Sequence, residues 1–108
     1  MSLAAEYASK LTSPEAATRP VASGETLAMA MAVAQPPALL AALSARVEAG
    51  DLEDLQLWYF HSMEHAARTL LRRELFDRVR PHCMFLTKIE RELIRQAGPG
   101  WQSEIEFV

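Results

Sequence analysis

The sequence is poor in several features that mark particular classes of protein. Its 108 residues include 4 glycines and a single cysteine, Cys83. One cysteine excludes an intramolecular disulfide and a cysteine cage for a metal, and neither of the glycine-rich phosphate-binding patterns is present. No stretch approaches the roughly 18 uninterrupted apolar residues of a membrane span, and the N-terminus lacks the segments of a signal peptide. The sequence therefore predicts a protein of the reducing cytoplasm, away from membranes.

Excess charge of one sign is also missing. Lys and Arg number 11 against 14 Asp and Glu, which gives a net charge of −3, whereas a nucleic-acid-binding domain usually has a pI above roughly 9. We therefore expect no nucleic-acid partner. Apolar residues are abundant at 50%, as in a folded chain, and the length suits one domain, residues 1–108, with a thin core.

Helical and strand patterns alternate along the chain. Ser13 and Pro14 predict the start of a short helix over Pro14–Thr18. The apolar run Thr26–Val33 has no alternation, which is typical of a strand buried on both faces. Pro37 opens a helix to about Ala49, which carries one leucine-rich face and ends before Gly50.

The second half continues the alternation. Leu55–Phe60 is rich in branched and aromatic residues and predicts a second strand. Ser62–Val79 fits one or two helices and is followed by a break at Pro81. The remaining elements are a third strand at Cys83–Leu86, a helix from Lys88 to about Ala97 and a fourth strand at Glu104–Val108.

This order predicts an α/β fold, a small three-layer unit with a mostly parallel sheet of about four strands. A sheet so small, with short helices, leaves a substantial face exposed. Self-association or a partner chain would cover it. A ligand would bind at the carboxyl ends of the strands, where the candidate residues are Gln35, His61 and Thr87.

Two local patterns have alternative interpretations. His61, Glu64 and His65 spell H-x-x-E-H, which on one helix face could hold zinc with the glutamate activating a water. His61 directly follows a predicted strand, however, and no third protein ligand is evident. Polar residues in a loop and a first helical turn are the alternative, which we favour, so no metal is expected.

The arginines and the cysteine also admit a structural interpretation. Five arginines crowd the segment 68–80 and suit anion recognition, yet Glu64 with Arg68, and Glu74 with Arg78, have the i,i+4 spacing of helical ion pairs. We favour a solvated, ion-paired surface. Cys83 is adjacent to His82, and neighbours on a strand point to opposite faces, so we interpret Cys83 as a core residue and not as a nucleophile.

Several motifs occur together in an order that resembles a known family. They are Tyr7 and Lys10 before Ser13-Pro14-Glu15-Ala16, then Val21-Ala22-Ser23-Gly24-Glu25-Thr26-Leu27, the apolar run to Val33, and Pro36-Pro37 before Leu39, Leu40 and Leu43. A strand ending in His61, Arg80 before Met84-Phe85, and Arg91 before Gly98 keep the same order. The chain resembles the N-terminal part of the acetyl-CoA hydrolase/transferase family, of the 4-hydroxybutyrate CoA-transferase type.

The resemblance implies a CoA-transferase-like N-terminal half-domain and a history of acting on acyl-CoA thioesters. It also implies that the catalytic glutamate and the glycine-rich CoA-binding segments lie in a C-terminal half that has no counterpart in these 108 residues. No residue of this chain is therefore assigned as catalytic. Alanines at positions 28, 30, 32 and 34 stand where the family often has glycines.

Three functions from different classes follow. The first is a truncated, non-catalytic relative of this domain that acts through self-association or a partner chain. The second is a subunit of a split acyl-CoA transferase or hydrolase, with coenzyme A or acyl-CoA bound only in company with a complementary chain. The third is a small-ligand-binding α/β module. For the isolated chain we expect no cofactor.

Overall fold

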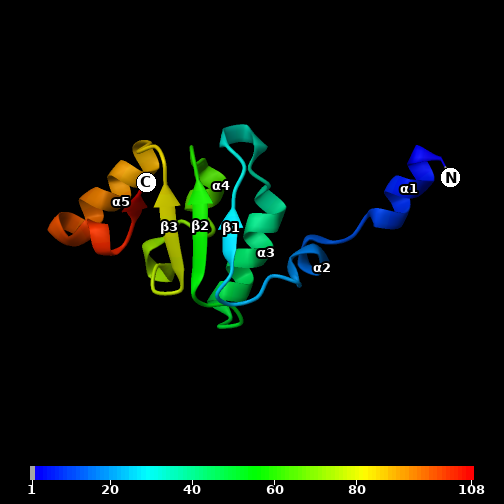
Figure 1. Cartoon of the computed structure of the whole chain (residues 1–108), viewed down its shortest axis with the longest axis horizontal. Helices are drawn as coiled ribbons and strands as arrows, with labels where there is room; N and C mark the ends of the chain where they lie inside the picture. The colour runs from blue at the N-terminus through cyan, green and yellow to red at the C-terminus, as the bar shows by residue number, and fades with distance from the viewer. Residues whose placement is uncertain (1) are drawn as a thin grey trace.

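One four-stranded sheet organises the molecule (Figure 1), which is a computed structural model describing residues 2–108. The strands are β1 (Thr26–Ala28), β2 (Leu55–Tyr59), β3 (Val79–Cys83) and β4 (Glu106–Phe107). They lie in the order β1-β2-β3-β4, and every neighbouring pair is parallel. The α/β class with a parallel sheet of four strands is thus confirmed.

Short helices connect the strands. The α-helices are α1 (Leu3–Lys10), α2 (Pro14–Thr18), α3 (Pro37–Glu48), α4 (Glu64–Ala67) and α5 (Lys88–Ala97), and the 3-10 turns are η1 (Ala32–Ala34), η2 (Arg73–Leu75) and η3 (Gly98–Ser103). The predictions of α2, α3 and α5 are confirmed. Ser13 caps α2 by accepting the Ala16 N–H at 3.1 Å, and Gly50 follows α3 with φ +79°, a conformation that glycine adopts without strain. Helix α1 had no counterpart in the sequence analysis.

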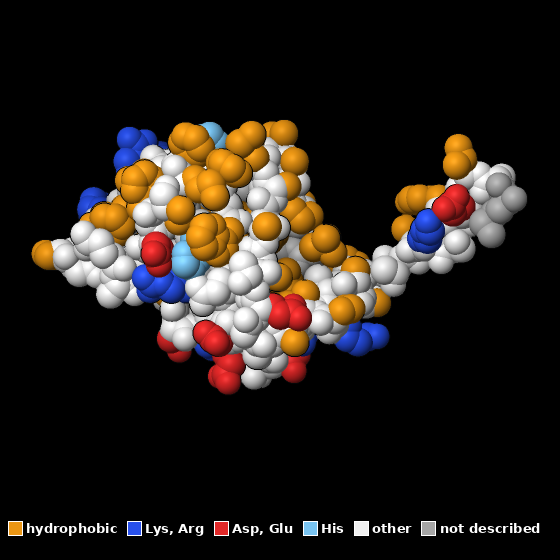
Figure 2. Space-filling view, in the orientation of Figure 1, with side chains coloured by type: hydrophobic (Ala, Val, Ile, Leu, Met, Phe, Trp, Pro, Cys, Tyr) orange, Lys and Arg blue, Asp and Glu red, His pale blue; other side chains and the backbone are white. Residues whose placement is uncertain are grey.

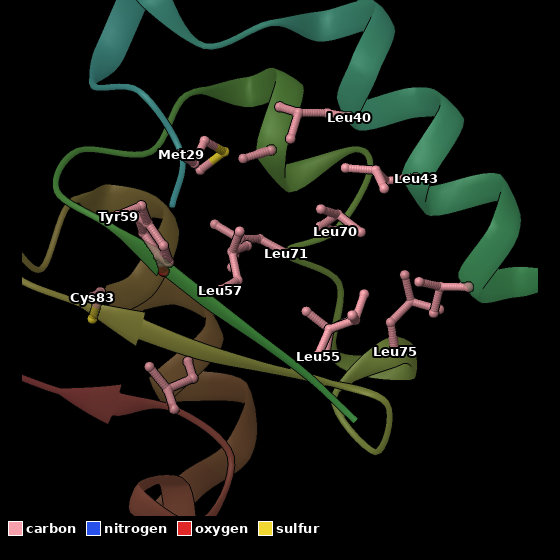
Figure 3. Close-up of a cluster of buried hydrophobic side chains, with 14 of the residues drawn as sticks. Met29, Leu40, Leu43, Leu55, Leu57, Tyr59, Leu70, Leu71, Leu75 and Cys83 are labelled. Atoms are coloured by element: carbon pink, nitrogen blue, oxygen red, sulfur yellow. The ribbon is translucent and has the colours of Figure 1, made fainter. Parts of the chain in front are cut away.

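The core lies on one face of the sheet (Figure 3). Leu55, Leu57 and Tyr59 of β2 alternate with half-buried neighbours and point into a cluster with Leu40 of α3 and Leu93 of α5. Burying apolar area in this way is the main stabilising term of the fold. The long helices therefore share one side of the sheet.

The opposite face of the sheet is uncovered. It carries Gln56, Trp58, Arg80 and His82 from the alternate positions of β2 and β3, and in Figure 1 the strands lie in front of α3 and α4. The Trp58 and His82 rings stack with centroids 4.5 Å apart. The described residues thus supply two of the three expected layers, and the exposed sheet face is present.

The first strand is much shorter than predicted. Thr26–Val33 was expected to be extended, but β1 ends at Ala28, after which only Met29 continues the pairing by donating to the Trp58 carbonyl at 2.9 Å. Ala32 then adopts φ +50° and turns the chain into η1. The prediction failed because alanine and methionine have little preference for strands, and contacts from the β2 end hold the turn.

The third strand was placed too late in the sequence. β3 runs over Val79–Cys83 and includes Pro81, where a break was predicted. Leu55 N donates to Arg78 O and Met84 N donates to Tyr59 O, so the even-numbered residues of β3 bond to β2. The Pro81 nitrogen therefore faces the β4 side, where pairing starts only at His82 with Glu106. Proline is tolerated there because no ladder hydrogen bond is lost.

Two further segments differ in extent. The predicted helices over Ser62–Val79 reduce to α4 and η2, while Leu70, Leu71 and Leu75 are still buried in the core. The fourth strand is Glu106–Phe107, shorter than Glu104–Val108, and it pairs with β3 of the same chain. Within residues 2–108, none of the helices has the length and apolar character needed to cross a bilayer.

Candidate functional site

Exposed apolar and aromatic side chains gather where the strands end. Met31, Phe60 and Phe85 are 52%, 44% and 47% exposed, and the His61 ring stacks on Phe85 with centroids 4.4 Å apart. Phe60 lies 6.1 Å from Phe85 between centroids. We call Met31, Phe60, His61 and Phe85 the strand-end surface. Figure 2 shows hydrophobic side chains along this edge, toward which the arrows of Figure 1 point.

The structure brings the three predicted binding residues to this same edge, but two of them are committed to structural bonds. Gln35 is buried, donates from Nε2 to the His61 carbonyl at 2.7 Å and accepts the Met63 N–H at 3.3 Å. Thr87 caps α5 and donates to Glu90 at 2.7 Å. Among the described residues, only the imidazole of His61 is left without a hydrogen bond of its own. Of the three, His61 is therefore the one free to meet a ligand.

A buried carboxylate positions the loops of the strand-end surface. Glu90 of α5 is 0% exposed, and it accepts hydrogen bonds from Ser62 Oγ at 2.7 Å and Thr87 Oγ1 at 2.7 Å. Ser62 follows His61, and Thr87 stands two residues after Phe85. Hydrogen bonds to a charged acceptor are the stronger kind. Glu90 therefore ties the end of β2 to the loop that carries Phe85. Sequence reasoning had placed this glutamate on a solvent face.

The neighbouring thiol and phenol are held in their neutral forms. Burial, with the nearby charge of Glu90 as the second cause, raises the pKa of Cys83 to about 11. The same two causes raise the pKa of Tyr59 well above its ordinary value. Cys83 is fully buried, so its interpretation as a core residue is confirmed. A thiol that stays protonated is no nucleophile at neutral pH.

The H-x-x-E-H pattern is divided between a loop and a helix. Glu64 and His65 belong to α4, but His61 precedes it and packs flat on Phe85. The two histidines therefore do not share a helical face. Within residues 2–108, no three His, Cys, Asp or Glu side chains converge as a metal site would require.

The crowded arginines are engaged with partners on the protein itself. Arg68 pairs with Glu64 at 3.1 Å, Arg73 with Glu104 at 2.8 Å, and Arg72 with Glu48. Arg78 donates to the Val47 carbonyl at 2.6 Å and Arg80 to the Ser103 carbonyl at 2.7 Å. The interpretation as an ion-paired surface fits these contacts. The expected pairing of Arg78 with the Glu74 carboxylate is replaced by one with Asp77.

The turn beside the strand-end surface contains a strained alanine. Ala32 has φ +50°, which places a Cβ where glycine is favoured. We expect Ala32→Gly to raise the free energy of unfolding by about 1 kcal/mol, measured by urea denaturation. Ala34→Gly, in the same turn at an ordinary φ, is the matched control and should be neutral or destabilising. Equal effects of both substitutions would show that Ala32 is unstrained.

Comparison with known proteins gives a consistent answer through structure alone. No known family matches the sequence, and a search of curated proteins finds no match either. The crystal structure of RipA from Yersinia pestis, by contrast, aligns with the whole chain at 44% identity and a TM-score of 0.89. The chain has a CoA-transferase-like fold.

Structures of two RipA mutants agree with this match. The M31G mutant aligns at 42% identity and a TM-score of 0.89, and the F60M mutant at 42% and 0.87. In each case the alignment covers 100% of this chain and 25% of RipA. The chain thus spans a quarter of the length of the solved structures that it matches. The resemblance drawn from the sequence motifs is supported at the level of the fold.

Proposed function

We propose that this chain is a CoA-transferase-like module of the acetyl-CoA hydrolase/transferase type, whose strand-end surface contacts the acyl part of an acyl-CoA thioester. The module does not transfer CoA by itself and acts through self-association or a partner chain. The observation that carries this proposal is the exposed cluster of Met31, Phe60, His61 and Phe85 at the carboxyl edge of a parallel sheet. Open α/β sheets bind their ligands at this edge.

The RipA mutants give the strand-end surface independent support. Two of the matching structures are of the M31G and F60M mutants, and this chain has methionine and phenylalanine at those numbers. Both side chains lie on the strand-end surface, although they come from different loops. Residues chosen for substitution in RipA therefore have the same residue types at the same numbers here, which agrees with a substrate-facing role.

The chemistry of the surface suits an acyl group better than the CoA headgroup. Phe60 and Phe85 offer apolar area, and the imidazole of His61 lies flat between solvent and Phe85. Nearby arginines are already paired, so the phosphates of CoA find few free cations. A thioester carbonyl could accept a hydrogen bond from His61. The nucleotide end of CoA would then require groups from a second segment or chain.

The test is binding of butyryl-CoA by calorimetry, with thiol release followed in parallel. We expect weak binding, with a dissociation constant on the order of 1 mM, that Phe60→Ala reduces about 5-fold through loss of apolar contact. Leu11→Ala, which removes another exposed apolar side chain far from this edge, should change nothing. Equal loss in both variants, or no binding at all, would contradict the proposal. Thioester cleavage that survives repurification would contradict its non-catalytic part.

A second candidate is a subunit of a split acyl-CoA transferase or hydrolase. The uncovered sheet face with Trp58 and His82 favours it, because parallel sheets are normally covered on both sides. His82 Nδ1 is buried there without a hydrogen-bond partner among the described residues. The two candidates differ in whether thioester turnover arises when a complementary chain is added.

A further inference from the structure

Helix α1 stands apart from the body of the molecule. None of its residues is buried, and Figure 1 shows it at the far end of an extended connection. The radius of gyration is 15.2 Å, whereas a compact chain of this length has roughly 13 Å. The structure therefore has a projecting N-terminal arm, residues 2–11.

The arm presents an unpartnered apolar face. Leu3, Tyr7 and Leu11 follow one another at intervals of four, and they are 85%, 67% and 64% exposed. An isolated helix shorter than about 12 residues is marginal in water. The Ser2 cap and the pair of Lys10 with Glu6 add only tenths of a kcal/mol to about 1 kcal/mol each. A stable α1 requires a surface against which this face packs.

A matching groove lies between α2 and α3. It has a volume of about 650 Å³ and is lined by Pro14 and Thr18 of α2 and by small side chains of α3. Ala38, Ala41, Ala45 and Ala49 are exposed along one side of α3, which is apolar on its outer as well as its inner side. A helix that is apolar all round is normally covered on all sides. Large side chains of α1 would fill the space above the alanines.

We propose that α1 of one copy of this chain packs into the α2–α3 groove of a second copy, with the exchange made in both directions. Leu11 and Ser13 are extended, with ψ 129° and 156°, and direct the arm away from its own groove. Charge is complementary, since Glu15 on the rim has no ion pair within the described residues and Lys10 ends α1. Reciprocal exchange closes as a two-fold dimer, in which the same surfaces are used twice.

Disulfide trapping between two single variants tests the exchange. Ala8→Cys lies beside the apolar face of α1, and Ala45→Cys lies in the groove. The native Cys83 is buried and does not compete. Mixing the two variants under mild oxidation should give a cross-linked species of two chains of 12.0 kDa each. Ser9→Cys, on the opposite side of α1, is the matched control and should cross-link far less with Ala45→Cys.

Three results would overturn the inference. These are no cross-link in the mixture, equal cross-linking by the Ser9 control, or a double variant that closes only within one chain. Light scattering on the unmodified chain adds a readout that needs no cysteine, with a dimer expected and a monomer after Leu3→Glu with Tyr7→Glu. The inference rests on the self-association part of the proposed function. Because butyryl-CoA binding by this monomeric variant should be unchanged, failure of either idea is distinguishable.

Discussion

Replacing Ser62 with alanine should lower the free energy of unfolding by about 2 to 3 kcal/mol. The substitution removes the hydroxyl that donates to the Glu90 carboxylate at 2.7 Å. Thr87 remains as the one side-chain donor to a carboxylate with no exposed surface. A buried charge that loses a donor keeps its desolvation cost, which is why the effect should exceed that of an ordinary hydrogen bond.

Urea denaturation at neutral pH measures this loss. Ser103→Ala removes an exposed serine whose hydroxyl bonds only to the Gly100 carbonyl, and it should cost less than about 0.5 kcal/mol. Adding Glu90→Gln to Ser62→Ala should recover part of the stability, because the charge that needs the donor is gone. A loss for Ser62→Ala no larger than that of the Ser103 control would refute the role of Glu90 as the tie between the two loops.

Alkaline pH should destabilise the protein through Cys83. Burial raises the pKa of this thiol to about 11, whereas in the unfolded chain it is about 8.5. Between these values the folded state holds a proton that the unfolded state has lost. Stability is therefore complete below about pH 8.5 and falls as pH rises, by about 2 kcal/mol up to about pH 10.

Denaturation midpoints at a series of pH values, in the unmodified chain and in Cys83→Ala, isolate this effect. The variant should show a nearly flat profile up to about pH 10, where Tyr59, whose pKa is also raised, begins to contribute. Labelling provides a second readout, because the native thiol should react with a thiol reagent far more slowly than the unfolded one. The same slope in both proteins would show that the thiol is not the cause.

The helices were predictable because their signals are local. Ser13 with Pro14, and Gly50 after α3, act within one turn of the residues that they terminate. The strands were less predictable, because their extent depends on neighbours distant in sequence. Pro81 looks like a breaker until β2 and β4 show which side of β3 is paired. β1 stops early because the His61 carbonyl, 29 residues from Ala32, holds the turn.

The candidate site was predictable in place but not in composition. The rule that ligands meet the carboxyl ends of parallel strands located the edge and named Gln35, His61 and Thr87. Tertiary contacts then committed Gln35 and Thr87 to loop structure. Met31, Phe60 and Phe85 were missed, because an apolar residue assigned to a strand gives no sign that it is exposed. Only the end of each strand, which the sequence leaves uncertain, decides that.

The most direct test of the account is an NMR titration of the isolated chain with butyryl-CoA. Amide shifts should be confined to the strand-end surface, around Met31, Phe60, His61 and Phe85, while the thioester stays intact. Shifts centred on the open sheet face at Trp58 and His82 would place the ligand elsewhere and favour a different small-ligand module. No shifts at any concentration, or cleavage of the thioester by the purified chain, would contradict the proposal that this fold presents an acyl-CoA surface without catalysing transfer.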